Sequence, residues 1–176
     1  TGWAHFKLDD VNKALESFQA QVNEYGEGVF ASDGRFMLAE CQFKLGKWEA
    51  ALALYQPLAG AKLSDQFKVL VLVHGGQAAR QLKQWDESLA LVNQVIEKHK
   101  DSVYLPQAQL TAGRAYYGKK EYDKAIADYT EAIRIKPDYA VGYSYRGRAH
   151  RELGNLVKAK ADFARAKELG YEPDDE

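Results

Sequence analysis

The sequence predicts an all-α protein in which antiparallel helix hairpins stack one on another as a solenoid. The main observation is a set of residues that returns 34 positions later. The repeated pairs are small and aromatic residues: Gly113 and Gly147, Ala125 and Ala159, Tyr129 and Phe163, Ala132 and Ala166. A fixed period of this size is typical of stacked helical hairpins. The small residues let two helices approach closely, and the aromatic residue fills the space between them.

The same pattern continues toward the N-terminus at steps of 37 residues. The small residue of each second helix recurs as Ala14, Ala51, Ser88 and Ala125. An aromatic or apolar residue follows four positions later, as Phe18, Tyr55 and Val92. We therefore predict one domain over residues 1–170, with about four full hairpins and a shortened first one. The expected hairpins are 1–28, 29–65, 66–102, 103–138 and 139–170, and a short acidic tail follows at 171–176.

Two details of the sequence predict departures from a uniform stack. A step of 37 exceeds one of 34 by three residues, which is nearly one helical turn. We therefore expect longer first helices in the middle hairpins. Pro57 lies inside the predicted second helix of the second hairpin. Because proline lacks a backbone donor and clashes with the preceding turn, that helix should end early or kink.

The repeated residues resemble those of the tetratricopeptide (TPR) family. The residues that carry the resemblance are Gly113, Tyr116, Tyr122, Ala125, Tyr129, Ala132 and Pro137. The resemblance implies a right-handed superhelix that acts as a protein-binding scaffold. The 37-residue spacing and the segment 101–108 are similar to TPR proteins of the bacterial cell envelope, which implies a part in an envelope assembly. Periplasm or cell envelope and cytoplasm both stay open as locations.

Composition and motifs give no sign of catalysis. The formal net charge of −1 argues against a protein built to hold nucleic acid. The four histidines form no His-Glu-x-x-His pair, and no phosphate loop or Gly-x-Ser-x-Gly motif is present. The single cysteine, Cys41, falls on the small-residue seam, where a buried apolar role is expected. No apolar run is long enough to span a bilayer. We predict no enzyme activity, no cofactor and no metal site.

The family resemblance implies that the first helices line a concave groove. The repeat register selects residues at i, i+4 and i+7 of each first helix as the partner-binding groove. These residues are Phe36, Glu40, Phe43, Val73, Gln77, Arg80, Leu110, Arg114, Tyr117, Tyr145, Arg148 and Arg151. The set changes from apolar to arginine-rich along the chain. Since arginine pairs with carboxylates through two parallel hydrogen bonds, we expect a protein or peptide partner with acidic groups.

A second interpretation of the groove arginines stays open. They could pair with neighbouring glutamates, at Glu40, Glu121 or Glu152, and only keep the surface polar. Surface pairs of this kind contribute little to stability and would need no functional reason.

TPR proteins that hold heat-shock chaperone tails use a lysine and asparagine clamp on this face. The matching positions hold other residue types: Phe36, Met37, Glu40, Leu70 and His74. The resemblance therefore does not imply chaperone-tail binding.

The N-terminal end suggests alternatives to groove binding. Trp3 and Phe6 lie on a half-hairpin with no partner in front of it, so we expect further repeats or a leader upstream. An open apolar end could also mediate self-association. The alternatives to a groove-binding scaffold are therefore a structural spacer or self-associating module, and an accessory domain of a larger enzyme.

Overall fold

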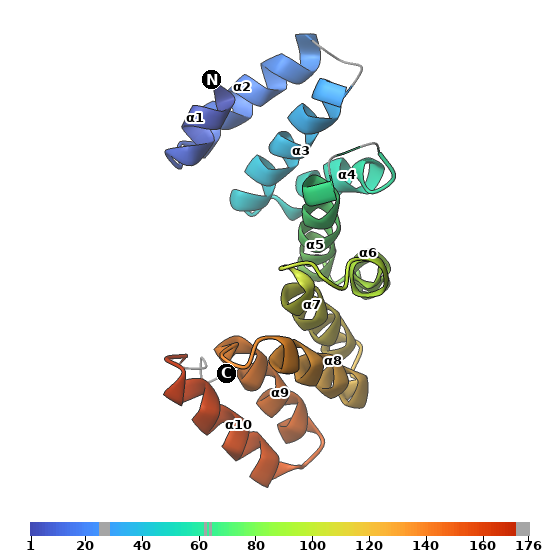
Figure 1. The fold of residues 1–176 in the computed structure, drawn as a ribbon, viewed down its shortest axis with the longest axis vertical. Helices are drawn as coiled ribbons and strands as arrows, with labels where there is room; N and C mark the ends of the chain where they lie inside the picture. Colours follow the sequence, from blue (N-terminus) through green and yellow to red (C-terminus); the bar gives the residue numbers. More distant parts are fainter. Residues whose placement is uncertain (25–28, 62, 64, 172–176) are drawn as a thin grey trace. The chain divides into compact units, whose positions relative to one another are not determined.

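The computed structural model describes residues 1–24, 29–61, 63 and 65–171, and these residues form ten α-helices (Figure 1). The chain divides into two compact units, Thr1–Gln84 and Trp85–Glu176, and each is treated by itself. The predicted acidic tail falls outside the described residues at positions 172–176, as does the predicted hairpin boundary at 28.

The first unit contains five helices, each packed on the next in sequence. They are α1 (Gly2–Lys7), α2 (Val11–Glu24), α3 (Val29–Lys44), α4 (Trp48–Leu58) and α5 (Asp65–Gln81). Helix α3 also contacts α5, the next helix but one. The core of this unit gathers around fully buried Phe18, Ala39 and Tyr55.

The second unit repeats this arrangement with five helices. They are α6 (Trp85–Lys98), α7 (Leu105–Gly118), α8 (Tyr122–Ile135), α9 (Ala140–Glu152) and α10 (Leu156–Glu168). Each packs on its neighbour in sequence, and α7 also contacts α9. The predicted all-α fold of sequential helix hairpins is confirmed.

One turn geometry closes the hairpins. The residue that leaves each first helix has a positive φ, whether it is a glycine, such as Gly46 at 69°, or not, such as Lys120 at 62°. The next N–H then bonds a carbonyl five residues back, as from Lys47 to Gln42 and from Glu121 to Tyr116. This is the Schellman arrangement, which satisfies carbonyls at a helix end and reverses the chain direction.

The predicted longer first helices are found in two of the three middle hairpins, and the predicted early helix end is found at Pro57. The lengthened helices α3 and α5 contain 16 and 17 residues, whereas α9 contains 13. Helix α7 has only 14 residues. In the 37-residue step from Ser88 to Ala125, the extra residues lie instead in the connection 99–104 between α6 and α7. Helix α4 has 11 residues and ends one residue after Pro57.

Candidate partner-binding faces

The predicted groove residues separate by their position in the helix. Phe36, Val73 and Leu110 hold the first place of each i, i+4, i+7 set, and they are only 2%, 0% and 7% exposed. They lie in the seams between helices, so the prediction that they line a surface is wrong. A first helix packs on other helices at both of its sides. Its exposed surface is therefore too narrow to include all three of the positions i, i+4 and i+7. The remaining nine predicted residues are partly or fully exposed.

In the first unit, Glu40 is held by neighbours from two other helices. The hydroxyl of fully buried Tyr55 donates to Glu40 Oε1 at 2.5 Å, and His74 Nδ1 lies 2.8 Å from the same oxygen. Burial, followed by the charge of Glu40, raises the pKa of Tyr55, so the phenol remains the donor. This carboxylate therefore joins α3, α4 and α5 within the unit.

Aromatic contacts extend this cluster. The ring of Phe43 stacks on the His74 ring with centroids 4.9 Å apart, and Trp48 meets Phe43 edge-on at 5.2 Å. Gln77 and Arg80 lie on α5 and are partly exposed. The predicted residues of the first unit therefore serve internal packing as much as a surface.

In the second unit, two arginines meet one tyrosine ring. The Arg114 guanidinium from α7 lies 4.4 Å from the centroid of Tyr145, and that of Arg148 lies 5.5 Å from it. Tyr145 itself stacks on buried Tyr129, with centroids 5.9 Å apart. A cation held over an aromatic face is attracted by the ring quadrupole. The structure thus brings Arg114, Tyr145 and Arg148 together, and we call them the arginine face.

Arg114 makes no ion pair with any residue that the structure describes, so the pairing interpretation fails for it. Its charge acts on Tyr139, at the start of α9, where burial raises the pKa and Arg114 partly opposes that rise. Tyr139 was missed by sequence reasoning because it precedes the helix from which the repeat register selects residues. A signal was present in the sequence, because an aromatic residue follows Pro137 and Asp138 directly before the start of a predicted first helix.

Beside the arginine face, Glu152 accepts from two tyrosines. The hydroxyls of Tyr117 and Tyr122 lie 3.3 and 3.5 Å from its two oxygens, and their rings meet at 66°. Burial, then the charge of Glu152, raises the pKa of Tyr117, so this hydroxyl stays protonated. Arg151 lies over the Phe163 ring at 5.9 Å. The Glu152 carboxylate therefore accepts hydrogen bonds from two tyrosine hydroxyls.

The predicted open N-terminal end is partly covered by its own unit. Trp3 meets Phe18 edge-on, with centroids 6.1 Å apart, and remains 46% exposed. Phe6 packs against the core, with the Lys44 ammonium 4.8 Å above its ring. Leu8 is 79% exposed. The apolar surface at this end therefore belongs to Trp3 and Leu8.

Other chemistry is sparse in the described residues. Within residues 1–24, 29–61, 63 and 65–171, no group of three or more His, Cys, Asp or Glu side chains is placed to hold a metal ion. Burial raises the pKa of the Cys41 thiol to about 11, which is the opposite of what a nucleophile needs. No helix in the same residues has the length and apolar character needed to cross a membrane.

Comparison with known proteins supports a repeat architecture. A model described as TPR repeat matches residues 113–154, and one described as tetratricopeptide repeat matches residues 1–62. Among solved structures, MamA from Desulfovibrio magneticus RS-1 superposes with a TM-score of 0.80 at 14% identity, over 96% of this chain and 90% of that one. A crystal structure of MamA gives a TM-score of 0.81 at 18% identity, over 97% of this chain and 94% of that one.

Relatives by sequence match shorter stretches. Heat shock protein STI1 from Saccharomyces cerevisiae is 30% identical over 94 residues, which is 53% of this chain and 16% of the relative. Hsc70-interacting protein 1 from Drosophila melanogaster is 30% identical over 90 residues, which is 51% of this chain and 23% of the relative. The match thus covers less than a quarter of either relative. Helix order and turn geometry agree with these matches, and residues 1–62 and 113–154 are tetratricopeptide repeat segments.

Proposed function

We propose that this protein is a non-catalytic interaction scaffold whose arginine face binds an acidic protein segment. The observation that carries the proposal is the placement of two guanidinium groups, from Arg114 and Arg148, over the single ring of Tyr145. Arg114 has no carboxylate partner among the described residues. A partner carboxylate would supply the acceptors that this guanidinium lacks.

The surroundings of the face support the same partner. Tyr145 is supported from below by Tyr129, so its ring holds the arginines before a partner arrives. Such preorganisation lowers the entropic cost of binding. Glu152, four residues after Arg148 on α9, accepts from Tyr117 and Tyr122. Tyr117 and Arg151 then extend the surface for a longer segment.

The names of the relatives suggest one class of partner. One of them is described as Hsc70-interacting protein 1 and another as heat shock protein STI1. In this chain the positions of the chaperone-tail clamp in the first unit include buried Phe36 and Met37, which disfavours a clamp there. An acidic chaperone segment on the arginine face is one partner within the proposal.

We also propose that the scaffold is part of a bacterial cell-envelope assembly. The 37-residue spacing resembles that of bacterial envelope proteins and favours an envelope assembly. The matched sequence relatives named above come from eukaryotes. Fractionation of the source cells, with this chain detected by antibody, tests the setting, since recovery with cytoplasmic proteins contradicts an envelope assembly.

The test is a titration of a fluorescent twelve-residue peptide, rich in aspartate and glutamate with one tyrosine, followed by anisotropy. Replacement of Arg114→Glu and Arg148→Glu should weaken binding at least about tenfold, since 1.4 kcal/mol of lost pairing already gives that factor. The matched control changes Lys158→Glu and Lys160→Glu, two exposed lysines on α10 that carry the same total charge. Equal weakening by both variants would show general attraction only and would contradict the proposal.

Self-association is a second candidate function, because Trp3 and Leu8 expose apolar surface from the first hairpin. Light scattering over a concentration series measures it. If the chain self-associates through this end, Trp3→Gln with Leu8→Gln should lower the mean mass to that of a monomer. A wild-type mass that stays monomeric at all concentrations excludes this candidate.

A further inference from the structure

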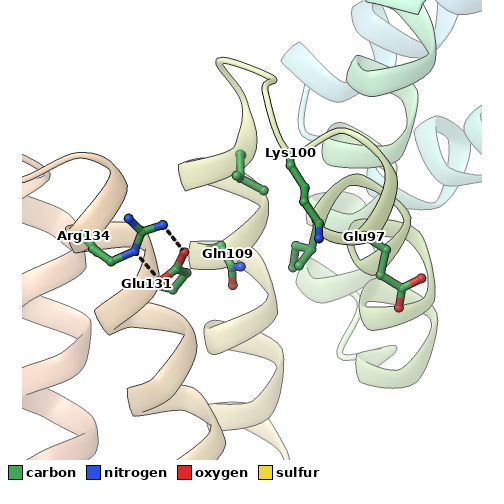
Figure 2. A pocket seen from close by; sticks show the side chains of 7 residues that line it. Glu97, Lys100, Gln109, Glu131 and Arg134 are labelled. Carbon is green, nitrogen blue, oxygen red and sulfur yellow. Dashed lines mark hydrogen bonds and ion pairs between the residues drawn. The ribbon is translucent and has the colours of Figure 1, made fainter.

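A pocket of about 510 Å³ lies in the second unit, away from the residues of the arginine face. It is lined by side chains from the end of α6, the connection after α6, the start of α7 and the last turns of α8. These are Ile96, Lys100, Leu105, Gln109, Glu131 and Arg134, with Glu97 as the seventh (Figure 2). A volume of this size is typical of small-ligand pockets and holds one to a few amino-acid residues.

The pocket contains a buried amide without a partner. Gln109 is 7% exposed, and its side chain makes no hydrogen bond with any residue that the structure describes. Its Oε1 is covered, so the Nε2 donor is the group left for a ligand. An amide that is buried without partners costs free energy, and buried polar groups are almost always satisfied. The buried atom without a partner is the acceptor Oε1. The Nε2 donor makes no hydrogen bond with a described residue either, so it is left to donate to an acceptor that the ligand brings.

The charges of the pocket favour an anion at that place. Lys100 makes no ion pair with a described residue. Glu131 is neutralised by Arg134, which donates to its two oxygens at 2.8 and 2.7 Å. Figure 2 shows this pair beside Gln109, and it shows the Glu97 carboxylate beyond Lys100 as seen from Gln109. Among the described residues that line the pocket, three polar groups are therefore unpaired. They are the ammonium of Lys100, the amide of Gln109 and the more distant carboxylate of Glu97.

The remaining lining is apolar. Ile96 and buried Leu105 supply a wall for an aliphatic side chain. Leu105 also begins α7, whose positive N-terminal end has the same sign as Lys100. Glu97 disfavours a second negative charge on the ligand.

We propose that this pocket binds a single carboxylate joined to an apolar side chain. The carboxylate would accept from Lys100 Nζ and Gln109 Nε2, and the side chain would contact Ile96 and Leu105. Two sources share this chemistry: the C-terminal residue of a peptide and a free apolar amino acid. The site is separate from the arginine face, so its success or failure does not depend on the proposed function.

The test uses ¹H–¹⁵N spectra of the full chain titrated with three probes. They are N-acetylated glycyl-alanyl-leucine with a free carboxylate, the same tripeptide with a C-terminal amide, and free leucine. Saturable shifts of the Gln109 side-chain amide and of backbone amides 105–109 are expected with a free carboxylate, and at least about tenfold weaker binding is expected with the amide. Binding of the tripeptide without leucine identifies a peptide end as the source, and binding of leucine identifies the amino acid.

Variants decide whether the named groups bind the probe. Lys100→Met and Gln109→Leu should each weaken binding at least about tenfold. Lys98→Met is the matched control, because Lys98 is an exposed lysine at the end of α6, two residues before Lys100, and does not line the pocket. The Arg114→Glu, Arg148→Glu variant should bind the probe as the wild type does. Equal affinity for acid and amide, unchanged affinity in Lys100→Met, or no shift at millimolar probe would overturn the proposal.

Discussion

Tyr129 packs its ring so closely on Gly113 that a β-carbon on Gly113 would lie 2.6 Å from Cε1 of the ring. Tyr129 is fully buried and Tyr145 stacks on it, so the ring has no space in which to move. Gly147 and Phe163 form the same contact 34 residues later, at 2.8 Å. This repeated contact sets how closely the two helices of a hairpin approach.

Replacement of Gly113→Ala should therefore destabilise the second unit. Overpacking of a filled core costs about 1–3 kcal/mol, which exceeds the helix propensity that alanine gains over glycine. Denaturant unfolding followed by circular dichroism measures the change. Gly60→Ala is the control, because nothing lies within 4 Å of a β-carbon at Gly60, and its stability should be unchanged or slightly higher. A neutral Gly113→Ala would show that the seam can relax.

The contact between α9 and α10 depends on an ion pair with little exposure to water. Arg146 donates from Nε and Nη2 to the two oxygens of Asp162 at 2.9 and 2.7 Å, and Asp162 is 6% exposed. Loss of one partner leaves the other charge unpaired, so Asp162→Ala should lower the free energy of unfolding by roughly 3 kcal/mol. The double variant Arg146→Met, Asp162→Leu should lose less than Asp162→Ala alone. The reverse order would show that the pair is not coupled.

Asp128 predicts a pH dependence of stability. Burial raises the pKa of this carboxyl to about 7 from an ordinary value of 3.8. Because the folded state holds the proton more tightly than the unfolded state, Asp128 reduces stability as the pH rises from about 4 to about 7. Asp128→Asn should therefore raise the melting temperature at pH 8 and change it much less at pH 4.

Melting curves of the wild type and this variant at several pH values test the sign. Asp123→Asn, at an exposed position on the same helix, is the control and should show no such trend. A melting difference that is the same at pH 4 and pH 8 would contradict a buried, proton-holding Asp128.

Cys41 is fully buried, and its thiol has a pKa of about 11. Since the thiolate is the reactive form, alkylation of the folded protein by iodoacetamide at pH 7.4 should be about a hundredfold slower than in denaturant. Mass spectrometry of timed samples measures both rates. Equal rates would show that α3 opens readily.

The sequence predicted the hairpin register well because the seam residues are constrained by size at every repeat. Gly113, Ala125 and Tyr129 could each be assigned from their counterparts 34 residues on, and the structure buries all three. The exposed stripe of a first helix is less constrained, and the selection by register placed Phe36, Val73 and Leu110 on it in error. Those three residues share one repeat position. A single error in the direction assigned to that position around the helix axis therefore explains why all three were predicted to be exposed.

The partners of individual side chains could not be predicted from the repeat. The bond of Tyr55 to Glu40 and the placement of Tyr139 near Arg114 depend on how far one helix reaches across another. The buried amide of Gln109 gave no signal, because a glutamine in the first turns of a helix is ordinary.

The arginine face is tested most directly by a reversal of partner preference. The Arg114→Glu, Arg148→Glu variant and the wild type are each titrated with an acidic peptide and with its lysine-substituted counterpart, at low and high salt. We expect that the wild type prefers the acidic peptide, that the variant prefers the basic one, and that salt reduces both preferences. Retention of the acidic preference by a fully folded variant would contradict the claim that Arg114 and Arg148 hold the partner.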